Sequence, residues 1–161
     1  MAIAQRPPFY RDGRRLLRYL LAAALVAASI FLTAPGRAEE SRIDADEAHR
    51  RAAAGEILLI DIRTPREWRR TGLPADAARA TLRAPHGNDG FLDRIERLTG
   101  GQRGAPVALI CAAGVRSAHA TRLLRQHGYT AVLDVHEGML GNGAGAGWLK
   151  RDLPVRSCDD C

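Results

Sequence analysis

The feature that most constrains the fold is a short apolar run that ends at a cysteine and leads into a helical pattern. Residues 107–110 read Val-Ala-Leu-Ile, a continuous apolar run that is typical of a strand buried on both faces. Cys111 follows directly and opens a loop of mostly small residues over 111–116. Ser117 is then predicted to cap a helix over 117–127. A strand, a loop and a helix in this order predict one unit of an α/β protein.

The remainder of the chain continues the alternation of strands and helices. Its apolar runs are continuous, which suits a parallel sheet covered by helices on both faces. A glycine-rich loop is predicted over 138–148. Further strands are predicted at Ile43, 56–63, 80–82 and 130–135, and helices at 45–54, 65–68 and 90–98, with Asp44 and Thr64 as N-caps. The whole pattern predicts one α/β domain with a parallel sheet.

Residues 1–38 predict a secretory signal peptide. They carry a net charge of +5, and most of their arginines lie in the first 18 residues. A mostly apolar run follows over 19–34, and then come Pro35 and small residues up to Ala38. The run is shorter than the roughly 20 residues that span a bilayer. We therefore expect cleavage after Ala38, export to the periplasm and no membrane anchor in the mature protein. An uncleaved anchor, and twin-arginine rather than general export, stay open as alternatives.

The rest of the chain is nearly neutral, because it carries only +1 of the total charge of +6. It shows no basic patch interleaved with aromatic residues, so nucleic-acid binding is not expected. A hydrophobic fraction of 46% over 161 residues is enough for one domain with a buried core. We expect a signal peptide over 1–38, one domain over 39–155 and a Cys-x-x-Cys tail over 156–161.

The residues around Cys111 predict a nucleophile pocket for a small anion. Ligand sites in open α/β sheets lie beyond the carboxyl ends of the strands, where Cys111 is expected. The N–H groups of a tight loop that leads into a helix stabilise an anion on the sulfur. The same field, with Arg116 nearby, favours the thiolate form of Cys111. A buried core cysteine without chemistry is the alternative.

Three stretches of the chain resemble the motifs of one family in the expected order. They are residues 58–68 (LLIDIRTPREW), 110–139 (the cysteine loop, its helix, the next strand and a glycine turn) and 147–155 (GWLKRDLPV). In these stretches the chain resembles a single-domain rhodanese, a sulfurtransferase, over about residues 41–155. The resemblance implies a rhodanese-like three-layer α/β fold, with a five-stranded parallel sheet and helices on both faces.

The resemblance also implies a reaction and a set of site residues. Cys111 would attack thiosulfate or a persulfide donor, become a persulfide itself, and pass the outer sulfur to a thiol or cyanide. The anionic sulfur would be held by the loop residues Ala112, Ala113, Gly114, Val115 and Arg116. Asp61 would accept hydrogen bonds near the loop, and Arg63 would pair with Glu67, chiefly as a structural ion pair. Ser117 would support the loop by capping the helix. No cofactor and no metal are expected.

Loop length separates sulfur transfer from related chemistries. Phosphatases and arsenate reductases of related fold carry Cys-x5-Arg, whereas Cys111 and Arg116 are spaced Cys-x4-Arg. A phosphate needs a wider cradle than one sulfur atom, so the shorter loop favours sulfur transfer. Residues 72–76 lack the histidine common in the family, and 140–147 (LGNGAGAG) resemble an insertion, which leaves the substrate open. The alternative function is a sulfur carrier or binding module that a protein partner loads.

Cys158 and Cys161 form a Cys-x-x-Cys pair in the last residues of the chain. In an oxidising compartment they can close a small disulfide. They can also exchange sulfur or electrons with Cys111 or with a protein redox partner. A metal half-site would need further ligands, since zinc takes four. A frayed tail with an incidental disulfide is the fourth reading.

Overall fold

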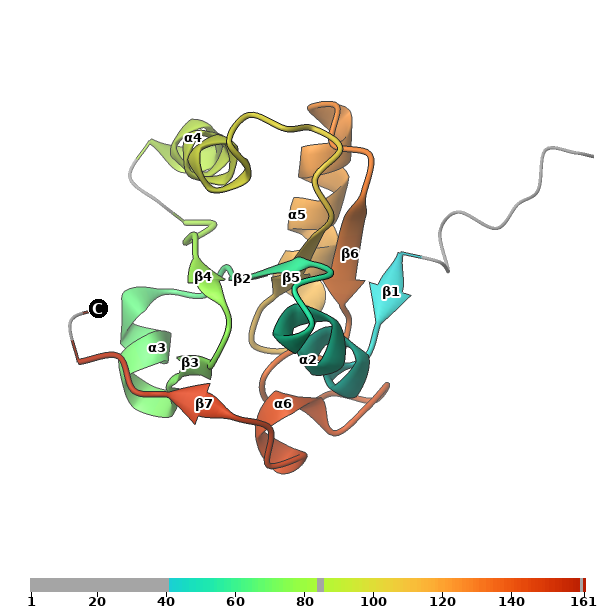
Figure 1. Cartoon of the computed structure of the whole chain (residues 1–161). Coiled ribbons are helices and arrows are strands. Elements are labelled where there is room, and N and C mark those ends of the chain that lie inside the picture. Colours follow the sequence, from blue (N-terminus) through green and yellow to red (C-terminus); the bar gives the residue numbers. More distant parts are fainter. Residues whose placement is uncertain (1–40, 84–85, 160) are drawn as a thin grey trace, which may run out of the picture. The chain divides into compact units, whose positions relative to one another are not determined.

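The computed structural model describes residues 41–83, 86–159 and 161, so the predicted signal peptide lies outside it. Within the described residues, five parallel strands form one sheet in the order β1-β6-β5-β2-β4 (Figure 1). In chain order the elements are β1 (Arg42–Ile43), α2 (Ala45–Ala53), β2 (Leu58–Asp61), α3 (Pro65–Thr71), β3 (Leu73–Pro74), β4 (Ala78–Arg79), α4 (Gly87–Thr99), β5 (Val107–Ile110), α5 (Val115–Gln126), β6 (Val132–Val135), α6 (Gly147–Lys150) and β7 (Val155–Arg156). The α/β class and the five-stranded parallel sheet that we predicted are confirmed.

Helices cover both faces of the sheet, and each face has its own core. Successive side chains of a strand point to opposite faces. Ile60 and Leu109 accordingly join a cluster with side chains of α4 and α5, whereas Leu59 and Ala108 join a second cluster with α2 and α6 (Figure 1). All four residues of β5 are 0% exposed. The strand that precedes Cys111 is therefore fixed from both sides.

Two helices begin at the caps that the sequence predicts. At the start of α2, the Asp44 carboxylate accepts a hydrogen bond from the Glu47 N–H at 2.8 Å. At the start of α3, the Thr64 hydroxyl accepts from the Glu67 N–H, and the Glu67 carboxylate accepts from the Thr64 N–H at 3.0 Å. This reciprocal capping box satisfies two N–H groups that a helix start leaves unpaired. It also fixes the position of the Glu67 side chain.

Several element boundaries differ from the predictions. Helix α3 continues past the expected end at Trp68, and the weak strand expected at 80–82 lies earlier, as β4. Helix α5 begins at Val115 because Gly114, with a φ of 85°, takes the N-cap position. Ser117 lies inside the first turn, so the prediction that it caps the helix is wrong. The loop after Cys111 is correspondingly shorter than the expected 111–116.

A small antiparallel sheet joins the end of the domain to α3, and the sequence did not predict it. Strand β3 pairs with β7, with Leu73 opposite Arg156 and Pro74 opposite Val155. Gly72, just before β3, has a φ of 74°, and a side chain there would lie 2.8 Å from the Arg156 carbonyl oxygen. This close approach explains why a glycine stands at the end of α3.

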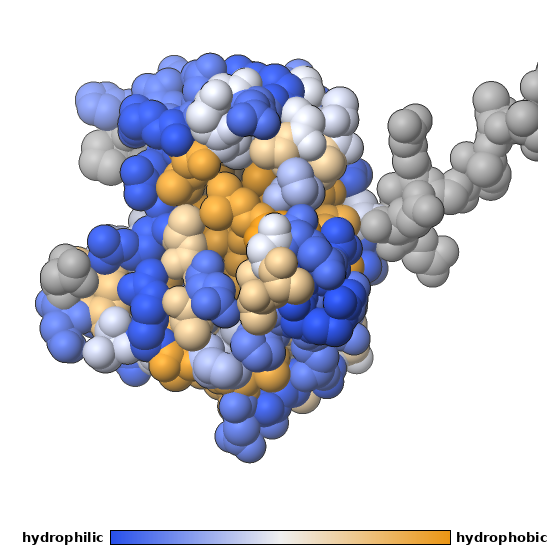
Figure 2. Space-filling view, in the orientation of Figure 1, coloured by the Kyte–Doolittle hydropathy of each residue, from blue (hydrophilic) through white to orange (hydrophobic). Residues whose placement is uncertain are grey.

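Figure 2 shows polar side chains over much of one face of the described residues, with apolar surface between the positions of α4 and α2. Among the residues that the structure describes, the exposed large hydrophobic ones are Val115, Leu140 and Val155. Val115 opens α5, and the Leu140 N–H bonds the carbonyl of Ala112, so two of them border the Cys111 loop. Within the described part of the chain, no helix has the length and apolar character needed to cross a membrane.

Candidate active site

Cys111 is buried at the carboxyl end of β5, where the sequence places the site. It is 1% exposed and is not in a disulfide. Its Sγ lies 3.6 Å from the Oγ of Ser117. The Ser117 hydroxyl donates to the Gly114 carbonyl at 3.0 Å, which leaves its lone pairs free to accept from a thiol. Ser117 is thus part of the site, although it supports the sulfur directly and not as a cap.

The loop after Cys111 is shaped by hydrogen bonds to its carbonyl groups. The carbonyl of Cys111 accepts from the Met139 N–H at 2.9 Å, and that of Ala112 accepts from the Leu140 N–H at 2.8 Å. The carbonyl of Ala113 accepts from the Asn142 side-chain amide at 3.1 Å. A planar trans peptide holds its C=O and N–H on opposite sides. The N–H groups of residues 112–114 therefore face away from the 139–142 segment and remain available as donors.

Two glycines permit this close approach of two backbones. Gly114 has a φ of 85°, and a Cβ there would lie 2.0 Å from the His136 carbonyl oxygen. Gly138 has a φ of 65°, and a Cβ there would lie 2.7 Å from the Ala112 carbonyl. No side chain fits at either position without moving the loop. The turn after β6 thus packs directly against the Cys111 loop and fixes its backbone.

The start of α5 adds further donors beside the loop. The first N–H groups of a helix have no acceptor within the helix. Gly114 has no side chain with which to cap Val115, Arg116 or Ser117. The N-terminal end of a helix also carries a partial positive charge that favours anions. The predicted anion-holding residues 112–116 are therefore brought together as one run of donors, with the last two in the helix.

The glycine-rich stretch that resembled an insertion is anchored to the domain through Glu137. This side chain is 0% exposed, and its carboxylate accepts from the N–H groups of Ala45 and Gly147 at 2.8 Å each. Burial raises the pKa of Glu137, but these hydrogen bonds and Arg151 outweigh it and lower the pKa. Asn142, which the sequence analysis missed, then holds the carbonyls of both Ala113 and His136. The stretch is a support for the Cys111 loop.

Arg116 is paired with Glu67. Its two terminal nitrogens contact the two carboxylate oxygens at 2.9 and 2.5 Å, and both side chains are 24% exposed. The hydrogen bonds from Arg116 are the largest cause that lowers the pKa of Glu67 to about 2. Because the capping box fixes Glu67, this pair fixes the direction of the Arg116 side chain. The role of Glu67 as the partner of Arg116 was missed, since the two residues are 49 positions apart.

The predicted pair between Arg63 and Glu67 is wrong. Arg63 instead bonds the carboxylate of Asp61 at 2.7–3.0 Å, with side chains 2% and 0% exposed. Its guanidinium also donates to the Thr71 hydroxyl and the Gly72 carbonyl. Asp61 lies in register between Ile110 and Arg79 on the neighbouring strands. The Asp61–Arg63 pair is thus a buried support beside the residue that precedes Cys111.

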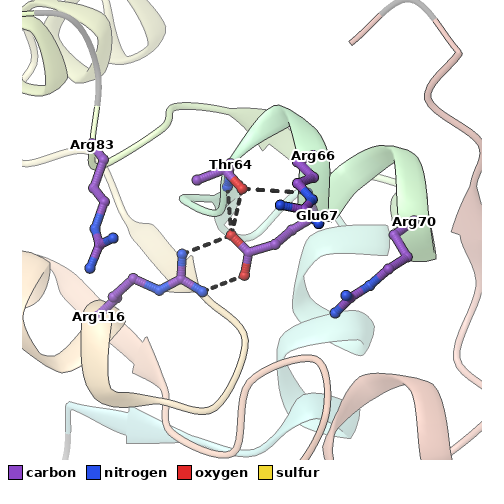
Figure 3. A pocket seen from close by; sticks show the side chains of 6 residues that line it. All are labelled: Thr64, Arg66, Glu67, Arg70, Arg83 and Arg116. Carbon is purple, nitrogen blue, oxygen red and sulfur yellow. Dashed lines mark hydrogen bonds and ion pairs between the residues drawn. The ribbon is translucent and has the colours of Figure 1, made fainter.

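A cationic pocket of about 610 Å³ lies beside the Arg116–Glu67 pair. Four of its six lining residues are arginines (Figure 3), and the full lining is Thr64, Arg66, Glu67, Arg70, Arg83 and Arg116. Within the described part of the chain, Arg66, Arg70 and Arg83 have no carboxylate partner. The pocket therefore attracts anions to the side of the loop where Arg116 stands.

The Cys158–Cys161 segment packs against the domain. The two cysteines form a disulfide, and Cys158 is 3% exposed in a cluster with Trp68 and Leu73. A guanidinium nitrogen of Arg79 lies 3.4 Å from the Sγ of Cys158 and 3.0 Å from that of Cys161. No group of three or more His, Cys, Asp or Glu side chains suited to a metal occurs among the described residues. The predicted disulfide between Cys158 and Cys161 is present, and its buried cysteine packs against Trp68 and Leu73.

Comparisons with known proteins agree with this architecture. The family model of the rhodanese-like domain matches residues 44–141. The chain belongs to the rhodanese family. A comparison with curated proteins finds no match.

Solved structures share the fold at low sequence identity. The polysulfide-sulfur transferase homodimer of Wolinella succinogenes is 23% identical, with a TM-score of 0.55, over 74% of this chain and 80% of that one. The Rv0390 protein of M. tuberculosis is 24% identical, with a TM-score of 0.58, over 73% and 97%. The rhodanese-like domain of the Alr3790 protein of Anabaena is 18% identical, with a TM-score of 0.57, over 73% and 80%. At these identities the likeness concerns the fold.

Proposed function

We propose that this protein is an exported rhodanese-type sulfurtransferase that moves sulfane sulfur through a persulfide on Cys111. The observation that carries the proposal is the arrangement around the sulfur. Cys111 stands at the carboxyl end of β5. The carbonyls of residues 111–113 bond the 139–142 segment, so the N–H groups of residues 112–114 point the opposite way and are available as donors. The first N–H groups of α5 follow directly. Such a run of backbone donors suits a singly bonded, negatively charged sulfur.

The first half-reaction loads Cys111. Its thiolate attacks the outer sulfur of thiosulfate, a new S–S bond forms, and the bond within thiosulfate breaks and releases sulfite with the electron pair. The loop donors stabilise the terminal sulfur of the persulfide. The Ser117 hydroxyl lies 3.6 Å from the sulfur of Cys111 and supports it from the first turn of α5. Cys111 is 1% exposed, so the attack takes place largely out of contact with bulk water.

The second half-reaction removes the outer sulfur from the Cys111 persulfide. A thiolate or cyanide attacks the outer sulfur, the S–S bond to Cys111 breaks, and the Cys111 thiolate returns. The cationic pocket beside Arg116 concentrates anionic donors and acceptors near the loop. No cofactor is needed in either step, since the sulfur atom moves between nucleophiles.

Steady-state kinetics test this proposal. With thiosulfate and cyanide varied together, a persulfide intermediate gives parallel double-reciprocal plots, which are typical of a ping-pong reaction. Cys111→Ser should abolish turnover, whereas Cys158→Ser/Cys161→Ser should retain it. Full activity of Cys111→Ser would contradict the assignment.

A second candidate function is a sulfur carrier that a protein partner loads. The pairing of Arg116 with Glu67 favours it, because the pair partly neutralises the guanidinium that a free inorganic dianion would use. This candidate predicts negligible turnover with thiosulfate and cyanide, together with rapid loading of Cys111 by a protein-bound persulfide. Fast turnover with the two small molecules alone would count against it.

The cellular location of the proposed activity follows from residues 1–38. We expect them to be removed after Ala38 and the domain to act in the periplasm, with a small sulfur compound and a thiol as its partners. N-terminal sequencing of the protein recovered from cells tests this point: a start at Glu39 supports export, and a start at Met1 contradicts it.

A further inference from the structure

The Cys158–Cys161 disulfide lies apart from the Cys111 loop and is not used in the reaction above. It packs against α3 and β3 through Cys158, which contacts Trp68 and Leu73. Cys158 is 3% exposed, whereas Cys161 is partly exposed. The side chain of Arg69 also donates to the carbonyl oxygen of Cys161. The two cysteines are thus held in place, with Cys158 buried and Cys161 partly exposed.

Arg79 places a positive charge on both sulfurs of the pair. Its guanidinium nitrogen is 3.0 Å from Cys161 Sγ and 3.4 Å from Cys158 Sγ. A neutral disulfide gains little from a cation. The thiolates that form when the disulfide is reduced gain much more, because a nearby arginine stabilises the anionic sulfur. The charge therefore favours the reduced state of the pair.

A purely structural role explains the pair less well. The two cysteines are separated by three positions, so the disulfide closes a very short loop. The entropy that a cross-link removes from the unfolded chain grows with the length of the loop it closes, so this one contributes little. The disulfide also joins no two distant elements. The features that remain to be explained are the Arg79 cation beside both sulfurs and the partial exposure of Cys161.

We propose that Cys158 and Cys161 form a second reactive site, a redox-active disulfide that exchanges with the dithiol of a protein partner. A thiolate of the dithiol attacks Cys161 Sγ, forms a mixed disulfide, and breaks the bond to Cys158. The electron pair leaves on the Cys158 sulfur beside Arg79. The second thiol of the partner then closes the partner's own disulfide and releases Cys161. The partner loses two electrons and two protons, and the Cys158–Cys161 pair gains them.

A redox titration of the folded protein tests this inference independently of sulfur transfer. Cys111→Ser leaves Cys158 and Cys161 as the remaining cysteines, since the chain has three. This protein is equilibrated in glutathione buffers of graded ratio, quenched with acid, and labelled with a maleimide polymer that reports free thiols on a gel. The expected result is a two-electron transition inside the glutathione range, as for reactive disulfides and unlike structural ones.

Arginine variants in the same background isolate the cause. Arg79→Gln should move the midpoint to a buffer about tenfold more reducing, because the thiolates lose the cation beside them. Arg79→Lys keeps the charge and should stay near the parent, as should the exposed control Arg97→Gln. Circular dichroism establishes that each variant is folded.

Two results would overturn the inference. One is a pair that stays oxidised in every glutathione buffer and opens only when denaturant unfolds the domain. The other is a transition that Arg79→Gln leaves in place.

Discussion

The domain holds two sulfur sites that are built from different parts of the chain. Around Cys111 the donors are backbone N–H groups, fixed because the 139–142 segment bonds the carbonyls on their other side. Beside Cys158 and Cys161 stands a side chain, Arg79, whose guanidinium donates to both sulfurs. A run of backbone donors suits the persulfide that we propose, because its outer sulfur projects from the cysteine and needs several donors at once. A single cation suits a thiolate that appears when a disulfide opens.

The Asp61–Arg63 pair lies between the two sites and should affect both. Asp61 is in register with Ile110, which precedes Cys111, and with Arg79. Asp61→Ala leaves the Arg63 charge buried without its carboxylate, and we expect a loss of about 3–5 kcal/mol in the free energy of unfolding. Urea unfolding measures it. The double variant Asp61→Ala/Arg63→Met should recover much of the loss, and no recovery would contradict the pairing as its cause.

Gly114→Ala should damage the Cys111 site and spare the disulfide. The new Cβ would stand 2.0 Å from the His136 carbonyl, so the loop must move. We expect turnover to fall about 100-fold, as for a misplacement of about 1 Å. Gly128→Ala is the matched control, because Gly128 has a φ of 86° and nothing within 4 Å of its added Cβ. It should cost about 1–2 kcal/mol in stability and leave turnover unchanged. Equal losses of turnover in both variants would contradict the claim that close packing against His136 fixes the Cys111 loop.

Glu67→Gln should change how stability depends on pH. The folded pKa of Glu67 is about 2, against an ordinary 4.5. Its ionised form therefore stabilises the fold above about pH 4.5, and this contribution disappears as the pH falls towards 2. After allowance for partial exposure, we expect about 2 kcal/mol at neutral pH. Unfolding of wild type and variant should differ at pH 7 and converge near pH 2.

The exposed pair of Arg103 and Glu96 supplies the control for that experiment. Its two side chains are 44% and 54% exposed, and their charged atoms are 3.5 Å apart. Glu96→Gln should change stability by less than about 1 kcal/mol at any pH. If Glu96→Gln and Glu67→Gln behave alike, the contact with Arg116 is not a stabilising ion pair.

Arg83→Gln should have the smallest effect and should concern substrate capture alone. Arg83 lines the cationic pocket and faces it in Figure 3. We expect the KM for thiosulfate to rise roughly two- to fivefold with kcat unchanged, because the residue acts through long-range attraction. Raising the salt concentration should shrink the difference. A change in kcat that salt does not affect would place Arg83 in the chemistry instead.

Local patterns were sufficient to predict the strand before Cys111, the caps Asp44 and Thr64, and the place of the cysteine loop. They failed where contacts between distant segments decide the outcome. The contact of Gly114 with His136 starts α5 earlier than Ser117. The family resemblance implied a pair between Arg63 and Glu67. Arg63 precedes the cap of α3, outside the helix where residues four apart lie side by side, and it bonds Asp61 instead. Arg79 and Asn142 carry no local signal at all.

The most direct test of the central claim is the intact mass of the mature protein before and after incubation with thiosulfate. The proposed chemistry predicts a gain of one sulfur atom, which cyanide removes. Cys158→Ser/Cys161→Ser should show the same gain, and Cys111→Ser should show none. A mass that does not change while Cys111 is reduced and accessible to alkylation, or a gain that persists in Cys111→Ser, would contradict a persulfide on this cysteine.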